Sequence, residues 1–216
     1  YLQDKEPELA ELPLQYKEYS VWQRRQESLL EDKLEYWQRK LNGVTLLNMP
    51  TDYVRSARQS VRGDSMKFRV NKELTGQLKS FSVREDVTLY MTLLTAFKVL
   101  LHRYCSQDDI CVGGAISGRL QQEFEPLIGF FVNTLALRTD LSGDPDFREA
   151  LQRVKGTLLE AYDHQEVPFE RIVKKVVAER DISQNPLFQV VFVLQNAPDA
   201  EMNTLDEVSL EKMNYQ

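Results

Sequence analysis

The segment Glu125–Arg138 constrains the fold more than any other stretch of this 216-residue chain. From Ile128 onward it is rich in β-branched and aromatic residues, and it lies between Pro126 and the polar turn 139–143. These features predict a strand from Ile128 to Arg138. Side chains alternate between the two faces of a strand, and here both faces are mostly apolar, which is typical of a strand covered on both sides.

Two polar side chains interrupt this apolar segment. Asn133 and Thr134 are neighbours in the chain, so they point to opposite faces of the predicted strand. One interpretation is that each bonds a neighbouring backbone group, as most buried polar side chains do. The other is that one of them lines a cavity that handles an amide or a thioester. The strand taken alone favours the first interpretation.

Composition excludes several classes of function. The net charge of −6 argues against nucleic acid as a partner, because phosphate binding needs clustered Lys and Arg. No apolar run approaches the roughly 20 residues that a membrane-spanning helix needs, so no membrane partner is expected. Cys105 and Cys111 are too few for a disulfide framework, and no metal-ligand set surrounds them. We therefore expect a reducing cytoplasm and no metal.

Apolar residues at helical spacing predict a long helix over 16–41, which Gly43 is placed to end. Asn71 is the expected N-cap of a short helix that ends near Asp86, and Thr88 is the expected N-cap of the next. This third helix carries the strongest apolar stripe, which we expect to be buried. Its members are Tyr90, Leu93, Leu94, Phe97, Leu100, Leu101 and Tyr104.

Further along the chain, Asp144 is the expected N-cap of a helix opened by Pro145, and Pro168 begins another. Strands are expected at 64–70, 110–116, 128–138 and 187–194. The last of these is almost continuously apolar, which indicates a central buried strand. Strands alternating with helical pairs predict an α/β fold with a mixed β-sheet covered by helices.

The sequence shows no self-evident active site. Neither of its two histidines sits in a metal-ligand pair, and no Gly-x-Ser-x-Gly nucleophile motif is present. Gly113 and Gly114 form no phosphate-binding loop, because the glycine-rich pattern and its lysine are missing. His164 ends one helix just before the next begins, where a histidine interacts well with free carbonyls, so a structural role is favoured.

Four segments, taken in order, resemble the motifs of the condensation domains of nonribosomal peptide synthetases. The similar segments are 16–22 (Tyr-Lys-Glu-Tyr-Ser-Val-Trp), 128–134 (Ile-Gly-Phe-Phe-Val-Asn-Thr) closing at Arg138, 164–170 (His-Gln-Glu-Val-Pro-Phe-Glu), and 180–187 (Arg-Asp-Ile-Ser-Gln-Asn-Pro-Leu). The fourth carries Gln184 where arginine is common in the family. The resemblance covers about 16–198.

The resemblance implies amide formation between a donor aminoacyl or peptidyl thioester and the amine of an acceptor aminoacyl thioester. The family's central histidine belongs to a His-His-x-x-x-Asp-Gly motif in the first half of the domain, and this chain has neither a His-His nor an Asp-Gly pair. We therefore expect the C-terminal lobe of a chloramphenicol-acetyltransferase-like, V-shaped domain, inactive alone. The lobe would span 16–198, after a lead-in over 1–15, with 199–216 as a remainder cut before the domain end.

The resemblance also implies partners and site residues. The expected partners are donor and acceptor peptidyl carrier proteins, an adjacent adenylation domain and the missing N-terminal lobe. No cofactor is expected to bind directly, because phosphopantetheine is carried by the carrier proteins. The residues expected to line the substrate tunnel are Asn133, Thr134, Ser117 and Gln195. Those expected to be structural are Arg138, His164, Arg180 and Asp181.

Three alternatives stay open on the sequence alone. The first is an epimerising or heterocyclising relative with the same fold. The Phe-Val-Asn-Thr strand favours a condensing type over this alternative. The second is a non-catalytic lobe that binds a carrier protein or a neighbouring domain. The third is an acyltransferase that uses coenzyme A, which would also need an upstream histidine. Either the connection 45–63 or the segment 118–126 is expected to reach another lobe, and the sequence does not distinguish them.

Overall fold

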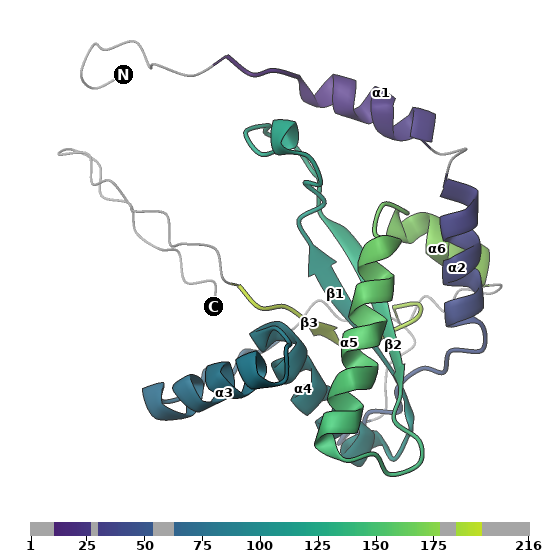
Figure 1. Cartoon of the computed structure of the whole chain (residues 1–216). Coiled ribbons are helices and arrows are strands. Elements are labelled where there is room, and N and C mark those ends of the chain that lie inside the picture. The colour runs from purple at the N-terminus through teal and green to yellow at the C-terminus, as the bar shows by residue number, and fades with distance from the viewer. Residues whose placement is uncertain (1–10, 27–29, 54–62, 178–184, 196–216) are drawn as a thin grey trace.

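A computed structural model describes residues 11–26, 30–53, 63–177 and 185–195 of the chain (Figure 1). Two helices come first, then two more helices, a β-hairpin with a short 3-10 turn in its loop, two helices and a last short strand. In chain order the elements are α1 (Tyr16–Gln26), α2 (Glu31–Leu41), α3 (Lys72–Arg84), α4 (Leu89–Cys105), β1 (Asp109–Ile116), η2 (Gln122–Phe124), β2 (Asn133–Asp140), α5 (Phe147–Asp163), α6 (Phe169–Val176) and β3 (Val191–Phe192). Within these ranges no helix is long and apolar enough to cross a membrane.

The described strands form a mixed sheet in the order β2-β1-β3. Strands β1 and β2 are antiparallel and pair from Asp109 with Asp140 to Ile116 with Asn133. Strand β3 runs parallel to β1. The mixed sheet is as predicted, but 187–194 is not its centre: only Val191–Phe192 is a strand, and the described sheet has β1 in the middle. The buried residues of this segment, Leu187 and Phe188, precede the strand, and Val191 within the strand is 51% exposed, so the continuous apolar sequence does not mark a central strand.

Helices cover both faces of β2, as its apolar alternation predicts. Helices α4 and α5 pack together on one face, and α2 and α6 pack together and contact β2 on the other (Figure 1). The three consecutive residues Leu135, Ala136 and Leu137 are all buried, so neither face is open to solvent. The predicted strand begins late, however. Residues 128–132 belong to the β1–β2 loop, where Ile128 and Phe130 are exposed.

Three of the expected helix starts are confirmed, those at Asn71, Thr88 and Pro168, and one is wrong. The side chain of Asn71 accepts from the backbone N–H of Leu74, and that of Thr88 accepts from Met91. Helix α5 is capped by Asp146 rather than Asp144. Asp146 and Glu149 form a reciprocal capping box, which satisfies two backbone donors at once and therefore fixes the start two residues later.

The predicted helix over 16–41 is two helices, because its halves pack into different cores. Helix α2 buries Trp37 in the main core, whereas α1 buries Tyr19 in a second cluster. The predicted strand at 64–70 is also wrong. Met66 is 91% exposed and Phe68 84% exposed, and no described strand pairs with this segment. Alternation predicts an extended backbone, but a strand needs a neighbour as well.

The buried face of α4 is rotated from the predicted stripe. Leu100 and Tyr104 are 49% and 64% exposed, and the centre of the buried face is Lys98. Its Nζ donates to the carbonyl of Leu137 (2.6 Å) and to the Thr139 hydroxyl (2.7 Å), and Nζ lies 3.5 Å from a third acceptor, the Ile110 carbonyl. A lysine is tolerated there because the ammonium has acceptors in place of water.

Burial lowers the pKa of Lys98 to about 7, and the charge of Lys40 also lowers it, while Cys111 and Asp109 act the other way. The folded pKa is below the unfolded value, so the unfolded state binds more protons between these two values. The free energy of unfolding should therefore rise with pH above about 7, by up to about 1.4 kcal/mol per pH unit.

We predict that Lys98→Met removes this dependence. In urea titrations between pH 7 and 8.5, the free energy of unfolding of the wild type should rise relative to that of the variant, because only the wild type has a buried lysine that loses its proton. Parallel stability curves for the two proteins would contradict the prediction. The titrations stop at about pH 8.5 because of the Cys111 thiol. Burial raises its pKa to about 12 in the folded protein. At higher pH the thiol therefore ionises only in the unfolded state, which lowers the free energy of unfolding.

Candidate functional site

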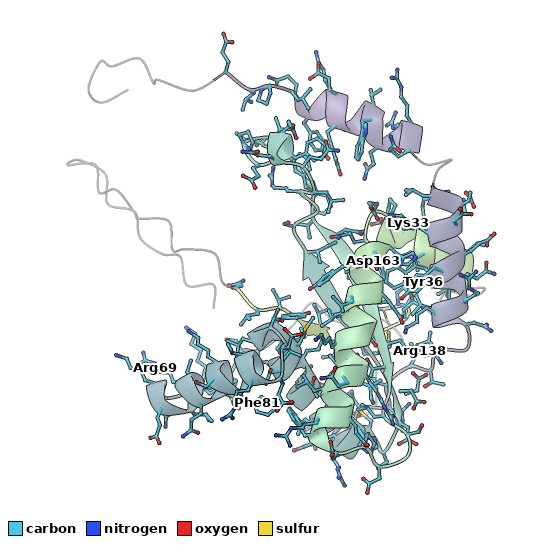
Figure 2. The ribbon with its side chains drawn as sticks, in the orientation of Figure 1. Lys33, Tyr36, Arg69, Phe81, Arg138 and Asp163 are labelled. Atoms are coloured by element: carbon cyan, nitrogen blue, oxygen red, sulfur yellow. The ribbon has the colours of Figure 1, made fainter. Side chains whose placement is uncertain are left out.

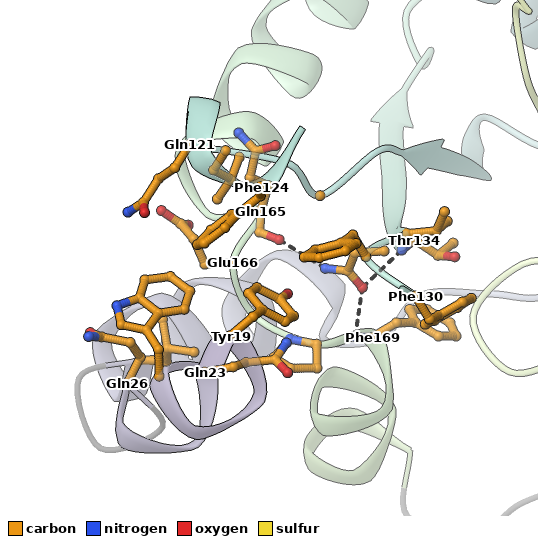
Figure 3. Close-up of a pocket in the computed structure, with 18 of the residues that line it drawn as sticks. Tyr19, Gln23, Gln26, Gln121, Phe124, Phe130, Thr134, Gln165, Glu166 and Phe169 are labelled. Carbon is orange, nitrogen blue, oxygen red and sulfur yellow. Dashed lines mark hydrogen bonds between the residues drawn. The ribbon is translucent and has the colours of Figure 1, made fainter. Parts of the chain in front are cut away.

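A cavity of about 650 Å³ lies where α1, the β1–β2 loop and the α5–α6 connection meet (Figure 3). Part of its wall is aromatic, formed by Tyr16, Tyr19, Trp22, Phe124, Phe130, Phe131 and Phe169. Polar side chains complete it, among them Gln23, Gln26, Lys33, Gln121, Asn133, Thr134, Gln165 and Glu166. Three of the four motif segments, 16–22, 128–134 and 164–170, therefore meet at one cavity.

The aromatic wall is a small core of its own. Tyr19, Phe124, Leu127 and Phe131 are buried together, apart from the main core. The Tyr19 ring lies 4.5 Å from that of Phe131 and 5.0 Å from that of Phe124, centre to centre. The hydroxyl of Tyr16 donates to the Phe130 carbonyl at 2.9 Å. Helix α1 is thus attached to the β1–β2 loop by rings and one hydrogen bond.

Asn133 fixes the opposite wall. Its Nδ2 donates to the carbonyls of Gln165 and Val167, both at 2.9 Å. Its Oδ1 accepts from the backbone N–H of Thr134 (2.9 Å) and of Phe169 (3.1 Å). Two donors and two acceptors are all that an amide side chain offers. Asn133 therefore uses every hydrogen-bonding site it has, and three of its four bonds tie the start of β2 to the α5–α6 connection.

His164 fixes the same connection from the side of α2. Its ring stacks on Tyr36 with centres 3.7 Å apart, and its Nδ1 lies 2.7 Å from the Glu160 carbonyl. Its own carbonyl accepts from the indole N–H of Trp37 at 2.9 Å. Burial and the Glu160 carboxylate raise the pKa of Tyr36, so this hydroxyl stays protonated and donates to Glu160. His164 does not line the cavity.

Three charged side chains line the cavity: Lys33 and Glu166, which pair with each other, and the exposed Glu170. The ammonium of Lys33 on α2 lies 2.7 Å from a carboxylate oxygen of Glu166, and both side chains line the cavity. Each is about one-third exposed, so water screens the pair. Burial raises the pKa of Tyr19, which keeps its phenol neutral. This part of the wall thus offers an apolar surface, neutral amides and a neutralised ion pair.

The other expected tunnel residues lie elsewhere. Ser117 and Gln195 are both exposed, and neither lines this cavity. Thr134 does line it, and within the described ranges its hydroxyl has no hydrogen-bond partner (Figure 3). Arg180 and Asp181 lie outside the described residues.

Arg138 links the sheet to the end of α2. Its guanidinium bonds both carboxylate oxygens of Asp109 at 2.8 Å, a pairing that raises the pKa of the arginine. It also donates to the carbonyls of Lys40 (3.0 Å) and Asn42 (2.7 Å), two of the free acceptors at the end of the helix. Figure 2 shows Arg138 beside the lower end of α2.

Sequence reasoning missed Lys33 and Arg119. Lys33 looks like a solvated residue of a helix, and only its place opposite Glu166 gives it a role at the cavity. Arg119 lies behind the cavity wall and bonds loop carbonyls, which leave no pattern in the sequence.

The cavity can bind an apolar group and an amide, but its own residues supply little catalysis. Neither histidine lines it, and among the described residues no group of three or more His, Cys, Asp or Glu is placed to hold a metal ion. The acid–base pair in its wall, Lys33 with Glu166, is neutralised. Its geometry suits holding and orienting a substrate whose chemistry is supplied by another group.

We predict that Asn133→Asp lowers the free energy of unfolding by about 2–3 kcal/mol, because two carbonyls lose their donor and face a carboxylate instead. Urea unfolding measures the change. Asn48→Asp, at an exposed position, is the matched control and should cost less than about 0.5 kcal/mol. Equal losses for the two variants would contradict the assignment.

Comparisons with known proteins agree with this architecture. The family model described as a condensation domain matches residues 1–216. A linear gramicidin synthase protein of Brevibacillus parabrevis is 51% identical over 199 residues, which cover 91% of this chain and 4% of that protein. Bacitracin synthase 3 of Bacillus licheniformis is 46% identical over 197 residues, 90% of this chain and 3% of that protein. The chain therefore spans a small fraction of these relatives.

Solved structures share the fold. The X-domain from teicoplanin biosynthesis superposes with a TM-score of 0.80 at 30% identity, over 88% of this chain and 44% of that one. The same kind of domain has been solved in complex with OxyB. SgcC5 from Streptomyces globisporus gives a TM-score of 0.68 at 34% identity, over 81% of this chain and 40% of that one.

Proposed function

Because this chain belongs to the condensation-domain family of nonribosomal peptide synthetases, we propose that it is the C-terminal lobe of such a domain. Its α/β fold is the chloramphenicol-acetyltransferase-like fold of that family. Residues 16–198 would form the lobe, with 1–15 leading in and 199–216 continuing it. The observation that carries the proposal is that three motif segments, far apart in sequence, meet at one cavity (Figure 3).

The proposed reaction forms an amide. The amine of an acceptor aminoacyl thioester attacks the carbonyl of a donor thioester, the new C–N bond replaces the C–S bond, and the donor thiol leaves with the proton. A histidine from a second lobe would move that proton, since neither histidine of this chain lines the cavity. The lobe would bind no cofactor itself. Phosphopantetheine arms of donor and acceptor carrier proteins would bring both substrates, and an adenylation domain would be adjacent.

The residues of this lobe would hold substrate rather than react. Asn133 uses all its hydrogen bonds within the chain, so it would shape the wall and not touch a thioester. Thr134 is the strand residue whose hydroxyl is left for a substrate carbonyl or amide. Ser117 and Gln195 are exposed and would take part where another lobe completes the passage.

The decisive experiment joins this chain to a lobe that carries His-His-x-x-x-Asp-Gly and supplies two loaded carrier proteins. We expect mass spectrometry to find the dipeptide on the acceptor carrier. Substituting the second histidine should abolish the product and leave carrier binding intact. A complete domain that binds both carriers and forms no amide would contradict the proposal. Coenzyme A thioesters should be poor substitutes for the carriers, which would exclude a coenzyme A-dependent acyltransferase.

In that complete domain Thr134→Val should lower kcat/KM roughly tenfold, the effect of one lost hydrogen bond of about 1.4 kcal/mol. Thr134→Ser keeps the hydroxyl and should retain most of the rate. Equal rates for the valine variant and the wild type would remove Thr134 from the substrate site.

A second function is a binding lobe without catalysis. It is favoured by the related X-domain that has been solved with OxyB as its partner, and by the 92% and 74% exposure of Ile128 and Phe130 on the β1–β2 loop. The same experiment separates the two functions, because a binding lobe would retain carrier or partner affinity and give no product.

A further inference from the structure

Arg119 lies at the start of the β1–β2 loop and organises its backbone. One guanidinium nitrogen donates to the carbonyls of Phe124 and, at 3.3 Å, Glu125. The other donates to the carbonyl of Leu127 at 2.9 Å. The guanidinium carbon also lies 4.2 Å from the centre of the Phe131 ring, within cation–π distance. One side chain thus bonds three carbonyls of the loop and also packs on an aromatic ring of the same loop.

The loop that Arg119 fixes is the surface on which α1 rests. Gly118 has a φ of +65°, and a Cβ there would overlap the Phe131 carbonyl oxygen, so the two sides of the loop touch backbone to backbone. A Cβ at Gly129 would overlap the ring of Tyr16 on α1. The rings of Tyr16 and Tyr19 both pack on Phe131, the same ring that the guanidinium covers.

Arg119 itself does not line the cavity, whereas its neighbours Gly118 and Leu120 do. We propose that Arg119 is a positioning residue: by fixing the β1–β2 loop it holds α1 in place and so sets the shape of the aromatic wall. The consequence for substrate rests on the proposed function, in which this wall receives the apolar part of an acyl group. The consequence for α1 is independent of any substrate.

Arginine is suited to this position because its donors diverge in a rigid plane. One planar guanidinium can donate to three carbonyls at different points of a loop, and its flat face can still pack on an aromatic ring. A lysine has the charge but neither the fork nor the flat face. Removing the side chain leaves half-buried carbonyls without donors, and the loop is expected to rearrange to hydrate them.

The chain contains a matched control. Arg153 on α5 also donates to two carbonyls, those of Asp140 (3.1 Å) and Ser142 (2.9 Å). Asp140 ends β2 and Ser142 lies in the turn that follows, and neither they nor Arg153 line the cavity. A general loss of stability should therefore affect Arg119→Met and Arg153→Met alike, whereas only the first should change the cavity.

The first test needs no substrate. Trp22 lines the cavity and is partly exposed, while Trp37, the second tryptophan of the chain, is fully buried in the main core. We expect Arg119→Met to increase acrylamide quenching of Trp22 fluorescence about twofold, Arg119→Lys to give an intermediate increase, and Arg153→Met to give none. Because Trp37 is fully buried, the quenchable fraction of the fluorescence reports Trp22. Equal quenching in the arginine variants and wild type overturns the proposal.

The second test uses the complete domain, with the aminoacyl-loaded donor carrier protein as the varied substrate and the loaded acceptor carrier protein in excess. We expect Arg119→Met to raise KM about tenfold with kcat changed less than twofold, partial rescue in Arg119→Lys, and no change in Arg153→Met. Equal KM effects in the Arg119 and Arg153 variants overturn the assignment while the proposed function stands. A wild-type domain without turnover instead refutes the proposed function, and the quenching test still decides the role of Arg119.

Discussion

The amide of Asn133 is the interaction on which the site depends most directly. It is the first residue of β2, and three of its four hydrogen bonds reach across to the connection between α5 and α6. His164 and Trp37 bind that same connection to α2 from the other side. The connection is therefore held between the sheet and a helix, with Glu166 and Phe169 presented to the cavity. A short turn becomes a rigid wall because backbone groups on both sides are bonded.

Recognising the family from the sequence was possible because its motifs are residues with exacting contacts. Asn133 needs all four of its partners, Pro168 starts a helix, and the aromatic residues of 16–22 pack on those of the β1–β2 loop. Such contacts tolerate few replacements, so they survive as recognisable patterns. The both-face burial of β2 and the caps of α3 and α4 were also predicted, since they follow from local rules.

The predictions that failed depended on partners that sequence does not show. The segment 64–70 alternates as a strand does, yet the described sheet offers it no neighbour. Counting apolar residues predicts a buried stripe on α4 that excludes Lys98. In the structure Lys98 is buried, because the Leu137 carbonyl and the Thr139 hydroxyl accept hydrogen bonds from its side chain. The cavity was beyond prediction for the same reason. Its wall combines α1, a long loop and a turn, and their convergence is a property of tertiary packing.

The pairing of β1 has a consequence for synthesis of the chain. Its antiparallel neighbour β2 follows at once, so the hairpin can form as soon as both strands have left the ribosome. Its parallel neighbour β3 comes only after α5 and α6, and until then one edge of β1 presents free amides and carbonyls. The nascent chain is therefore exposed to mispairing with other emerging chains until residues 141–192 have been translated. Translation speed across this range would matter to folding as much as the contacts of the finished fold.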